Sequence, residues 1–333
     1  MSLLGDANFT TQEFDSFLNT PFSSTILMKH KDFISTKDLT KEDILYILDV
    51  AKRIEAAKKE EKINLLNGKI LATLFFEPST RTRLSFESAM KQLGGGVIGF
   101  ADKAVTSVVK GESLMDTIRV IERYSDIIVI RHPLDGAARL SGDISKIPII
   151  NAGDGSNQHP TQTLLDMYTI QKIKGRLENL NIGFLGDLKY GRTVHSLALA
   201  LSLFNVNLYF ISPAVLKMPP YLINEVKNNN HNIIETDDLY GVSKDLDIIY
   251  ATRVQKERFA DIMEYEKVKE SYKLNKESLK EFKQNVKIMH PLPRVDELGY
   301  DLDDTENAVY FEQLANGIPI RQALICLLLG VLE

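Results

Sequence analysis

The chain has 333 residues, of which 44% are hydrophobic and 26% are charged. This length and composition predict a water-soluble protein that divides into two domains. The net charge of −5 and the isoelectric point near 5.8 argue against a nucleic acid or an anionic membrane as partner, so any basic site must be local.

The N-terminal region carries no targeting pattern. Residues 1–22 contain Asp6, Glu13 and Asp15 but no Lys or Arg, unlike a secretory or organellar presequence. No apolar run reaches the length of a membrane span. We therefore expect a cytoplasmic protein with an N-terminal extension over residues 1–24, and a leader removed from the sequence stays an alternative.

The first half of the chain alternates between helical and strand patterns. Ile44–Ala57 is predicted to be an amphipathic helix, and two further helices should begin after Ser79 and Glu112. The apolar runs predicted to be strands are Ile70–Phe76, Ile127–Ile130 and Pro148–Ile150. This alternation is typical of an α/β domain with a parallel sheet.

The second half repeats this pattern. Its predicted strands are Ile182–Leu185, Leu208–Ile211, Ile248–Tyr250 and Val286–Met289, and its predicted helices are His195–Phe204 and Leu274–Phe282. The helices His159–Lys174 and Phe311–Leu329 are expected to join the two halves. The sequence thus predicts two doubly wound parallel-sheet domains joined by interdomain helices. One covers 25–160 and is completed by a C-terminal helix, 311–333, and the other covers 161–310.

The most informative segment is Phe75-Phe76-Glu77-Pro78-Ser79-Thr80-Arg81-Thr82-Arg83, between a predicted strand and a predicted helix. A helix start has unpaired N–H groups and partial positive charge, and here three hydroxyls and two guanidinium groups join them. Guanidinium also pairs with phosphate oxygens through two hydrogen bonds. The segment predicts an anion site. The alternative is that Ser79 is an ordinary N-cap and the arginines are solvated.

Other polar groups follow the remaining strands of the first half. Arg131 follows one predicted strand, and His159 and Gln162 follow the next. Each is weak evidence alone, since strand-end turns and histidines are usually structural. Because ligands bind beyond the carboxyl ends of parallel strands, we expect these groups beside the anion site, with function concentrated at the interdomain cleft.

The second half offers candidate groups for an organic ligand. Arg192 follows Gly186-Asp187-Leu188-Lys189-Tyr190-Gly191, which lacks the dinucleotide-binding glycine pattern. Arg253 and Gln255 could hold a carboxylate, although a solvated charged loop explains them equally well. In His290-Pro291-Leu292-Pro293-Arg294, prolines fix the backbone so that carbonyl groups could accept from an amide.

The sequence gives no sign of a metal or organic cofactor. The six histidines lack the spacing of metal ligands. The only cysteine, Cys326, lies in an apolar run and is predicted to be buried rather than nucleophilic. Lys110 would be an ordinary exposed lysine on its own.

Taken together, these motifs resemble the catalytic chains of the aspartate carbamoyltransferase family, over Ile26–Val331. The segments that carry the resemblance occur in the family's order: residues 76–82, 131–133, 159–162, 186–192, 252–255 and 290–294. The resemblance implies transfer of the carbamoyl group from carbamoyl phosphate to L-aspartate, in pyrimidine biosynthesis. It also implies a homotrimer with shared active sites and no cofactor.

The resemblance also assigns a role to each residue. The phosphate would be bound by Ser79, Thr80, Arg81 and Thr82, the carbonyl oxygen polarised by Thr82, Arg131 and His159, and the carbamoyl nitrogen held by Gln162, the Leu292 carbonyl and Pro293. Aspartate would be bound by Arg192, Arg253, Gln255 and Lys110, the lysine coming from a neighbouring subunit. Glu77, Arg192 and Arg258 would hold the domains closed.

Two alternatives are kept. An ornithine-type carbamoyltransferase would share the phosphate half, but that relative carries a cysteine where this chain has Pro291, and Arg253 suits an anionic substrate. A non-catalytic binding or scaffold homologue is the other alternative.

Overall fold

The computed structural model describes residues 31–102, 104, 106–229, 232–254, 263 and 272–332. The chain divides into two compact units. The described parts of unit 1 are residues up to Ile34, Glu42–Asp154 and the residues from Ile318 onward; unit 2 comprises Ser35–Lys41 and Gly155–Gly317.

Unit 1 is built on a parallel sheet. Its strands are β1 (Ile70–Phe75), β2 (Gly96–Phe100), β3 (Ile127–His132) and β4 (Ile149–Asp154), in the order β2-β1-β3-β4. Its helices are α2 (Lys41–Ala56), α3 (Lys59–Lys62), α4 (Thr80–Gln92), η4 (Ser107–Lys110), α5 (Leu114–Ile121), α6 (Ala137–Ile144) and α13 (Gly317–Leu328). The first residues of α2 and α13, Lys41 and Gly317, belong to unit 2.

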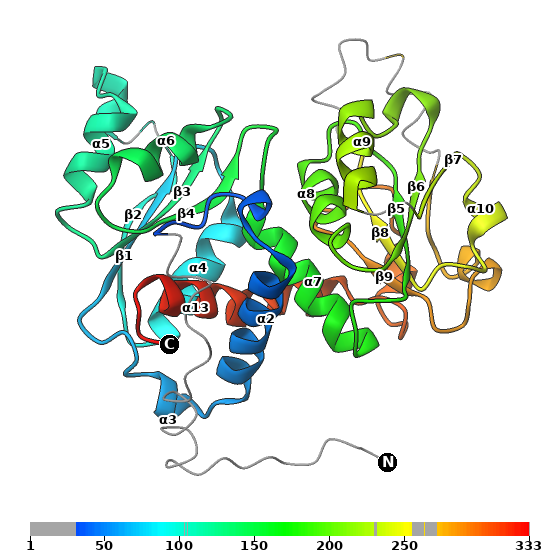
Figure 1. Cartoon of the computed structure of the whole chain (residues 1–333), viewed down its shortest axis with the longest axis horizontal. Coiled ribbons are helices and arrows are strands. Elements are labelled where there is room, and N and C mark those ends of the chain that lie inside the picture. Colours follow the sequence, from blue (N-terminus) through cyan, green and yellow to red (C-terminus); the bar gives the residue numbers. More distant parts are fainter. Residues whose placement is uncertain are drawn as a thin grey trace. The chain divides into compact units, whose positions relative to one another are not determined.

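The strand order determines which face of this sheet each helix covers. The β1–α4–β2 connection runs in one direction along the sheet, whereas those through α5 and α6 run in the other. Because such crossovers are right-handed, α4 lies on one face and α5 and α6 on the opposite face, as Figure 1 shows. The face toward α5 and α6 buries Ile118, Ile128, Ile130 and Ala138. The unit is therefore doubly wound.

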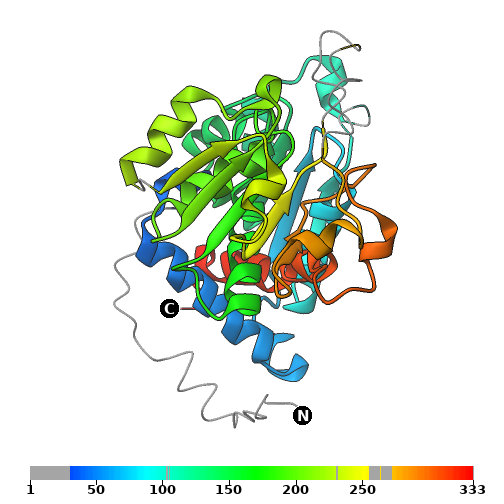
Figure 2. The same ribbon diagram turned by 90° about the vertical axis from the view of Figure 1, so that its right-hand side faces the viewer.

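Unit 2 contains a second parallel sheet. Its strands are β5 (Asn181–Leu185), β6 (Asn207–Ile211), β7 (Ile233–Thr236), β8 (Ile248–Ala251) and β9 (Lys287–Met289), in the order β7-β6-β5-β8-β9. Its helices are η2 (Thr36–Asp38), α7 (Pro160–Lys174), α8 (Arg192–Leu201), η5 (Ala214–Leu216), α9 (Pro220–Asn229), α10 (Leu239–Val242), η7 (Ser278–Glu281), η8 (Tyr300–Leu302) and α12 (Tyr310–Ala315). Figure 2 shows strands of this sheet side by side. The predicted fold class, two doubly wound parallel-sheet domains, is confirmed.

Some predicted elements are wrong. The helix expected over Leu274–Phe282 is only the short η7, because Leu274 pairs with Leu298 in a β-bridge and Asn275 and Ser278 exchange side-chain bonds with backbone N–H groups. The helix expected over Phe311–Leu329 is two helices, α12 and α13, which separate at Asn316. The sequence reasoning also missed β2 and β7.

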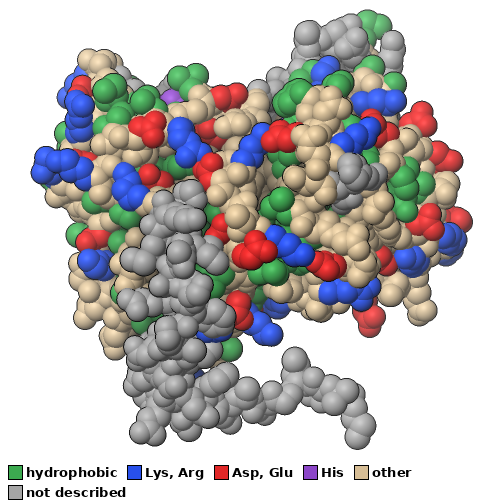
Figure 3. Space-filling model, viewed as in Figure 1, with side chains coloured by type: hydrophobic (Ala, Val, Ile, Leu, Met, Phe, Trp, Pro, Cys, Tyr) green, Lys and Arg blue, Asp and Glu red, His purple; other side chains and the backbone are tan. Residues whose placement is uncertain are grey.

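The single cysteine is buried, and charged side chains lie on the surface. Cys326 is fully buried as predicted, and burial raises the pKa of its thiol to about 12. Within the described residues, no helix is long and apolar enough to cross a membrane. On the face shown in Figure 3, basic and acidic side chains are interspersed.

Candidate active site

The predicted anion site lies at the start of α4, directly after β1. Ser79 occupies the N-cap position with extended backbone, but its side chain makes no capping hydrogen bond. The first turn of α4 holds no acidic residue, and Thr82 is buried within it. Ordinary N-capping therefore does not account for the Ser79 hydroxyl, and the start of α4 has the chemistry of an anion site.

The guanidinium groups of Arg81 in α4 and Arg131 in β3 interact electrostatically. Partial burial and the positive charge of Arg131 lower the pKa of Arg81 from its ordinary value. The side chain of Arg131 is 11% exposed; its Nη2 donates to a Glu77 carboxylate oxygen at 3.4 Å and its Nη1 to the Ala152 carbonyl at 3.5 Å. Its Nε is buried and has no hydrogen-bond partner among the described residues. A buried donor of this kind is rare in proteins and indicates a missing acceptor.

The sheet topology places both arginines at one point. In the order β2-β1-β3-β4, the chain leaves β1 toward β2 and later continues from β3 on the other side of β1. Ligands of open parallel sheets bind at such a switch point, beyond the carboxyl ends of the two strands. Arg81 follows β1, and Arg131 is the penultimate residue of β3, where the pairing of β3 with β4 is irregular between Ile130 and His132. The second arginine of the motif, Arg83, instead pairs with Glu87 on α4, at 2.7 Å.

His159 and Gln162 lie at the start of α7, in unit 2. His159 is the buried N-cap residue of this helix, and its side chain makes no capping bond. Gln162 is buried, and its Nε2 donates to Asp166 at 2.8 Å. The expectation that both lie beside the anion site stays a prediction.

The second switch point lies between β5 and β8. The turn after β5 needs glycine at position 186, where φ is +112° and a Cβ would lie 2.4 Å from the Thr252 carbonyl oxygen. The buried Asp187 then accepts hydrogen bonds from the backbone of Lys189 and Tyr190, which leads the chain into α8. Arg192 begins α8 and donates to the carbonyl of Gly155.

The other residues predicted to bind aspartate or to hold the domains closed lie as follows. Arg253 follows β8 and is half-buried. Lys110 ends η4, is exposed, and forms no ion pair with any described residue. Gln255 and Arg258 lie outside the described residues. For Glu77, predicted to contact Arg192 and Arg258, the structure shows the contact with Arg131 described above.

The loop after β9 has a fixed conformation. Leu292 has φ of +52°, its N–H donates to Nδ1 of His290 at 2.8 Å, and the Leu292–Pro293 peptide is cis. Arg294 anchors the far end of the loop through two hydrogen bonds to the Asp303 carboxylate and one to the Tyr310 hydroxyl, so it acts in structure rather than in recognition.

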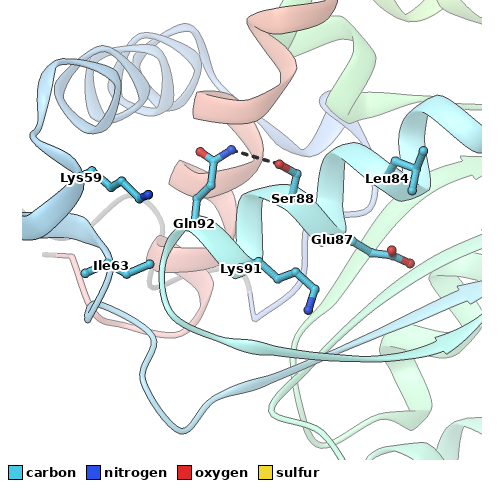
Figure 4. Close-up of a pocket in the computed structure, with 7 residues that line it drawn as sticks. All are labelled: Lys59, Ile63, Leu84, Glu87, Ser88, Lys91 and Gln92. Carbon is cyan, nitrogen blue, oxygen red and sulfur yellow. Dashed lines mark hydrogen bonds between the residues drawn. The ribbon is translucent and has the colours of Figure 1, made fainter.

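A pocket in unit 1 lies away from these groups. Its volume is about 520 Å³, and it opens between α3 and α4 as shown in Figure 4. The residues that line it are Lys59, Ile63, Leu84, Glu87, Ser88, Lys91 and Gln92. None of them belongs to the predicted site, so the pocket gives no support to that site.

Comparison with known proteins identifies the family. Residues 31–172 match the aspartate/ornithine carbamoyltransferase carbamoyl-P binding domain, and residues 178–328 match the Asp/Orn binding domain of the same family. The aspartate carbamoyltransferase catalytic subunit of Thermococcus onnurineus is 58% identical over 306 residues, 92% of this chain and 99% of that protein. The chain belongs to the aspartate carbamoyltransferase family. The catalytic subunit from Methanocaldococcus jannaschii is also 58% identical, over 90% of this chain and 97% of that protein.

Solved structures of the aspartate carbamoyltransferase family agree. The catalytic subunit of the M. jannaschii enzyme has a TM-score of 0.84 at 55% identity, over 90% of this chain and 99% of that chain. The Trypanosoma cruzi enzyme in complex with N-(phosphonacetyl)-L-aspartic acid has a TM-score of 0.82 at 35% identity, over 90% and 96% of the two chains. The predicted reaction, carbamoyl transfer to aspartate in pyrimidine biosynthesis, is therefore confirmed rather than the ornithine-type or non-catalytic alternative.

Sequence reasoning missed one buried polar group that contacts Gln162. Asp166 lies on α7 one turn after Gln162 and is fully buried. A single acidic residue in a helix gives no sequence signal of burial, and its other partners lie far along the chain. Only the arrangement in space reveals it.

Proposed function

We propose that residues 79–82 and Arg131 bind the phosphate and polarise the carbonyl of carbamoyl phosphate. The observation that carries this proposal is the buried Nε of Arg131, which lacks an acceptor among the described residues while Arg81 lies close enough to have its pKa lowered. Two adjacent guanidinium groups repel each other, and a dianionic phosphate would relieve that repulsion. Ser79, Thr80 and Thr82 add hydroxyl donors at the start of α4.

The chemistry needs orientation and charge stabilisation but no protein nucleophile. The amine of aspartate attacks the carbamoyl carbon, the carbonyl oxygen gains negative charge, and phosphate leaves. Thr82, Arg131 and His159 stabilise that oxygen in the proposal; the position of His159 at the start of α7 adds the partial positive charge of the helix. The departing phosphate accepts the proton of the amine.

The carbamoyl nitrogen requires hydrogen-bond acceptors. Gln162 offers one, because its Nε2 is used by Asp166 and its Oε1 accepts no hydrogen bond from any described residue. The Leu292 carbonyl, next to Pro293, is the second acceptor in the proposal. These groups distinguish an amide from a methyl group at the same position.

The aspartate set consists of Arg192, Arg253, Gln255 and Lys110. Arg192 is proposed to bind the α-carboxylate, and Arg253 with Gln255 the β-carboxylate. The positions of Arg192 and Arg253 after β5 and β8, the switch point of the second sheet, support this part. Salt bridges of Glu77 with Arg192 and Arg258 are proposed to hold the two domains closed.

The assembly is proposed to be a homotrimer in which Lys110 acts in the site of a neighbouring subunit. The exposure of Lys110 and its lack of an ion pair with any described residue support this role. In this proposal, the domain of residues 25–160, completed by residues 311–333, binds carbamoyl phosphate, and the domain of residues 161–310 binds aspartate. The composition of the chain supports the cytoplasm as the proposed location.

Substrate choice tests the proposal. We expect kcat/KM for aspartate to exceed that for ornithine by at least about 10³-fold, because ornithine offers an ammonium group where Arg253 requires a carboxylate. The measurement is the formation of the carbamoylated amino acid from carbamoyl phosphate, with each amino acid as the sole acceptor. Comparable values for the two amino acids would overturn the assignment of the aspartate set.

A further inference from the structure

Asp166 is a buried carboxylate, and three side chains of the described residues donate hydrogen bonds to it. Its Oδ1 accepts from Nε2 of Gln162 at 2.8 Å and from Nε2 of Gln313 at 2.6 Å, and its Oδ2 accepts from the Tyr250 hydroxyl at 2.7 Å. The side chains come from α7, α12 and β8, all within unit 2. Because burying a carboxylate costs several kcal/mol, such a group persists only where donors surround it. Hydrogen bonds from three elements to one buried carboxylate restrict the positions of all these side chains.

The carboxylate fixes which way each glutamine amide faces. An ionised carboxylate only accepts hydrogen bonds, so the NH₂ groups of both glutamines must face Asp166 and both amide oxygens must face away. The oxygen of Gln162 is thereby presented as an acceptor. The oxygen of Gln313 accepts from the backbone N–H of His290 at 2.8 Å.

The same network continues into the loop after β9. His290 receives the N–H of Leu292 on its Nδ1, so its ring proton is on Nε2, which lies 2.8 Å from a Glu297 carboxylate oxygen. Leu292 has positive φ, which residues other than glycine adopt only where their surroundings enforce it. The Leu292 carbonyl thus lies at the end of a chain of hydrogen bonds that begins at Asp166.

We propose that Asp166 is a positioning residue that orients both acceptors of the carbamoyl NH₂ group, Gln162 Oε1 and the Leu292 carbonyl. The inference rests on the proposed function, which supplies the roles of those two acceptors. It assigns the preference for a carbamoyl over an acetyl donor to a residue that does not contact the substrate.

Tyr250 provides a matched control. Burial, together with the negative charge of Asp166, raises the pKa of its phenol well above the ordinary value, so it is a protonated donor to Oδ2. It contacts the same carboxylate but leads to neither acceptor. If any weakening of the network lowers the selectivity for carbamoyl phosphate, Tyr250→Phe should lower it too. If the selectivity depends on the orientation of the two acceptors, Tyr250→Phe should leave it unchanged.

The experiment measures the selectivity between carbamoyl phosphate and acetyl phosphate, which differ by NH₂ against CH₃. Dissociation constants are measured by calorimetry on the full chain, with inorganic phosphate as the third ligand. In Asp166→Leu we expect the ratio of the acetyl phosphate constant to the carbamoyl phosphate constant to fall about tenfold or more. Gln313→Met removes only the hydrogen bonds that lead from Asp166 to Leu292, and it should lower this ratio about threefold.

Two variants should keep the ratio within about twofold. Asp166→Asn can still accept from both glutamines through Oδ1 and donate to the Tyr250 oxygen, and Tyr250→Phe leaves both acceptors in place. Phosphate binding should stay within about twofold of wild type in every variant, since the network does not include the phosphate donors.

Three results would overturn the inference. One is an unchanged ratio in Asp166→Leu, or in Gln313→Met if Asp166→Leu does not fold. Another is an equal fall in Tyr250→Phe, which would make the network merely structural. A wild-type ratio near one would instead refute the proposed function itself, and the inference with it.

Discussion

Replacement of Arg81 by alanine should nearly abolish carbamoyl transfer while leaving the fold intact. Arg81 lies in the first turn of α4, at the switch point of the first sheet, and the positive charge of Arg131 lowers its pKa. A guanidinium that makes two charge-assisted bonds to phosphate contributes about 1.5–3 kcal/mol for each bond. We therefore expect kcat/KM to fall about 10²- to 10⁴-fold in an assay for carbamoyl aspartate.

Arg83→Ala is the matched control for this substitution. Arg83 lies two residues further along the same helix and pairs with Glu87 at 2.7 Å. The loss of an exposed or half-exposed pair between residues four apart costs only about 0.3–0.5 kcal/mol, so activity should stay within about twofold. A folded Arg81→Ala protein with wild-type activity and wild-type affinity for carbamoyl phosphate would remove the assignment of the phosphate site.

Hybrid trimers should recover activity that neither parent has. Lys110→Ala and Arg81→Ala proteins are each expected to be nearly inactive. If Lys110 acts in the neighbouring subunit's site, every mixed trimer contains one site with both residues intact. Random reassembly of equal amounts should therefore restore about a quarter of wild-type activity. The measurement is the carbamoyl aspartate assay after reversible dissociation and reassociation.

Subunit exchange is the control for the hybrid experiment. The two variants mixed without dissociation should remain inactive, because recovery depends on new interfaces rather than on the presence of both proteins. If trimers that verifiably contain both chains are as inactive as their parents, Lys110 acts within its own chain or is only a solvated lysine.

The strands of both sheets could be predicted from the sequence where they are buried on both faces. Such strands read as continuous apolar runs, as in Ile70–Phe75, and their positions were predicted to within a few residues. The edge strands β2 and β7 were missed because none of their residues is buried and they carry no such run. Local periodicity also could not reveal that Leu274 pairs with Leu298.

The final helices show a similar limit. Their apolar pattern continues from Phe311, yet the helix is interrupted at Asn316. The side chain of Asn316 donates to the Thr169 hydroxyl at 2.9 Å. That partner lies 147 positions earlier in the chain, so the break depends on tertiary contact. Pro319 is tolerated because it lies in the first turn of α13.

One part of the candidate site could be predicted from the sequence and another part could not. Hydroxyl and guanidinium groups at the start of a helix carry their chemistry locally, so the anion site around Arg81 could be predicted from one segment. The network around Asp166 could not, because Gln162, Tyr250 and Gln313 come from three distant segments. A neutral amide or a tyrosine in a helix or strand gives no local sign of such a partner.

The central claim is that the start of α4 binds the phosphate of carbamoyl phosphate. The most direct test is an experimental structure of this protein with N-(phosphonacetyl)-L-aspartate bound. We predict the phosphonate at residues 79–82, within hydrogen-bond distance of Arg81, with Nε or Nη of Arg131 donating to the ligand and its two carboxylates on Arg192 and Arg253. A phosphonate bound elsewhere, for example between Lys59 and Lys91 in the pocket beside α3, would contradict the account.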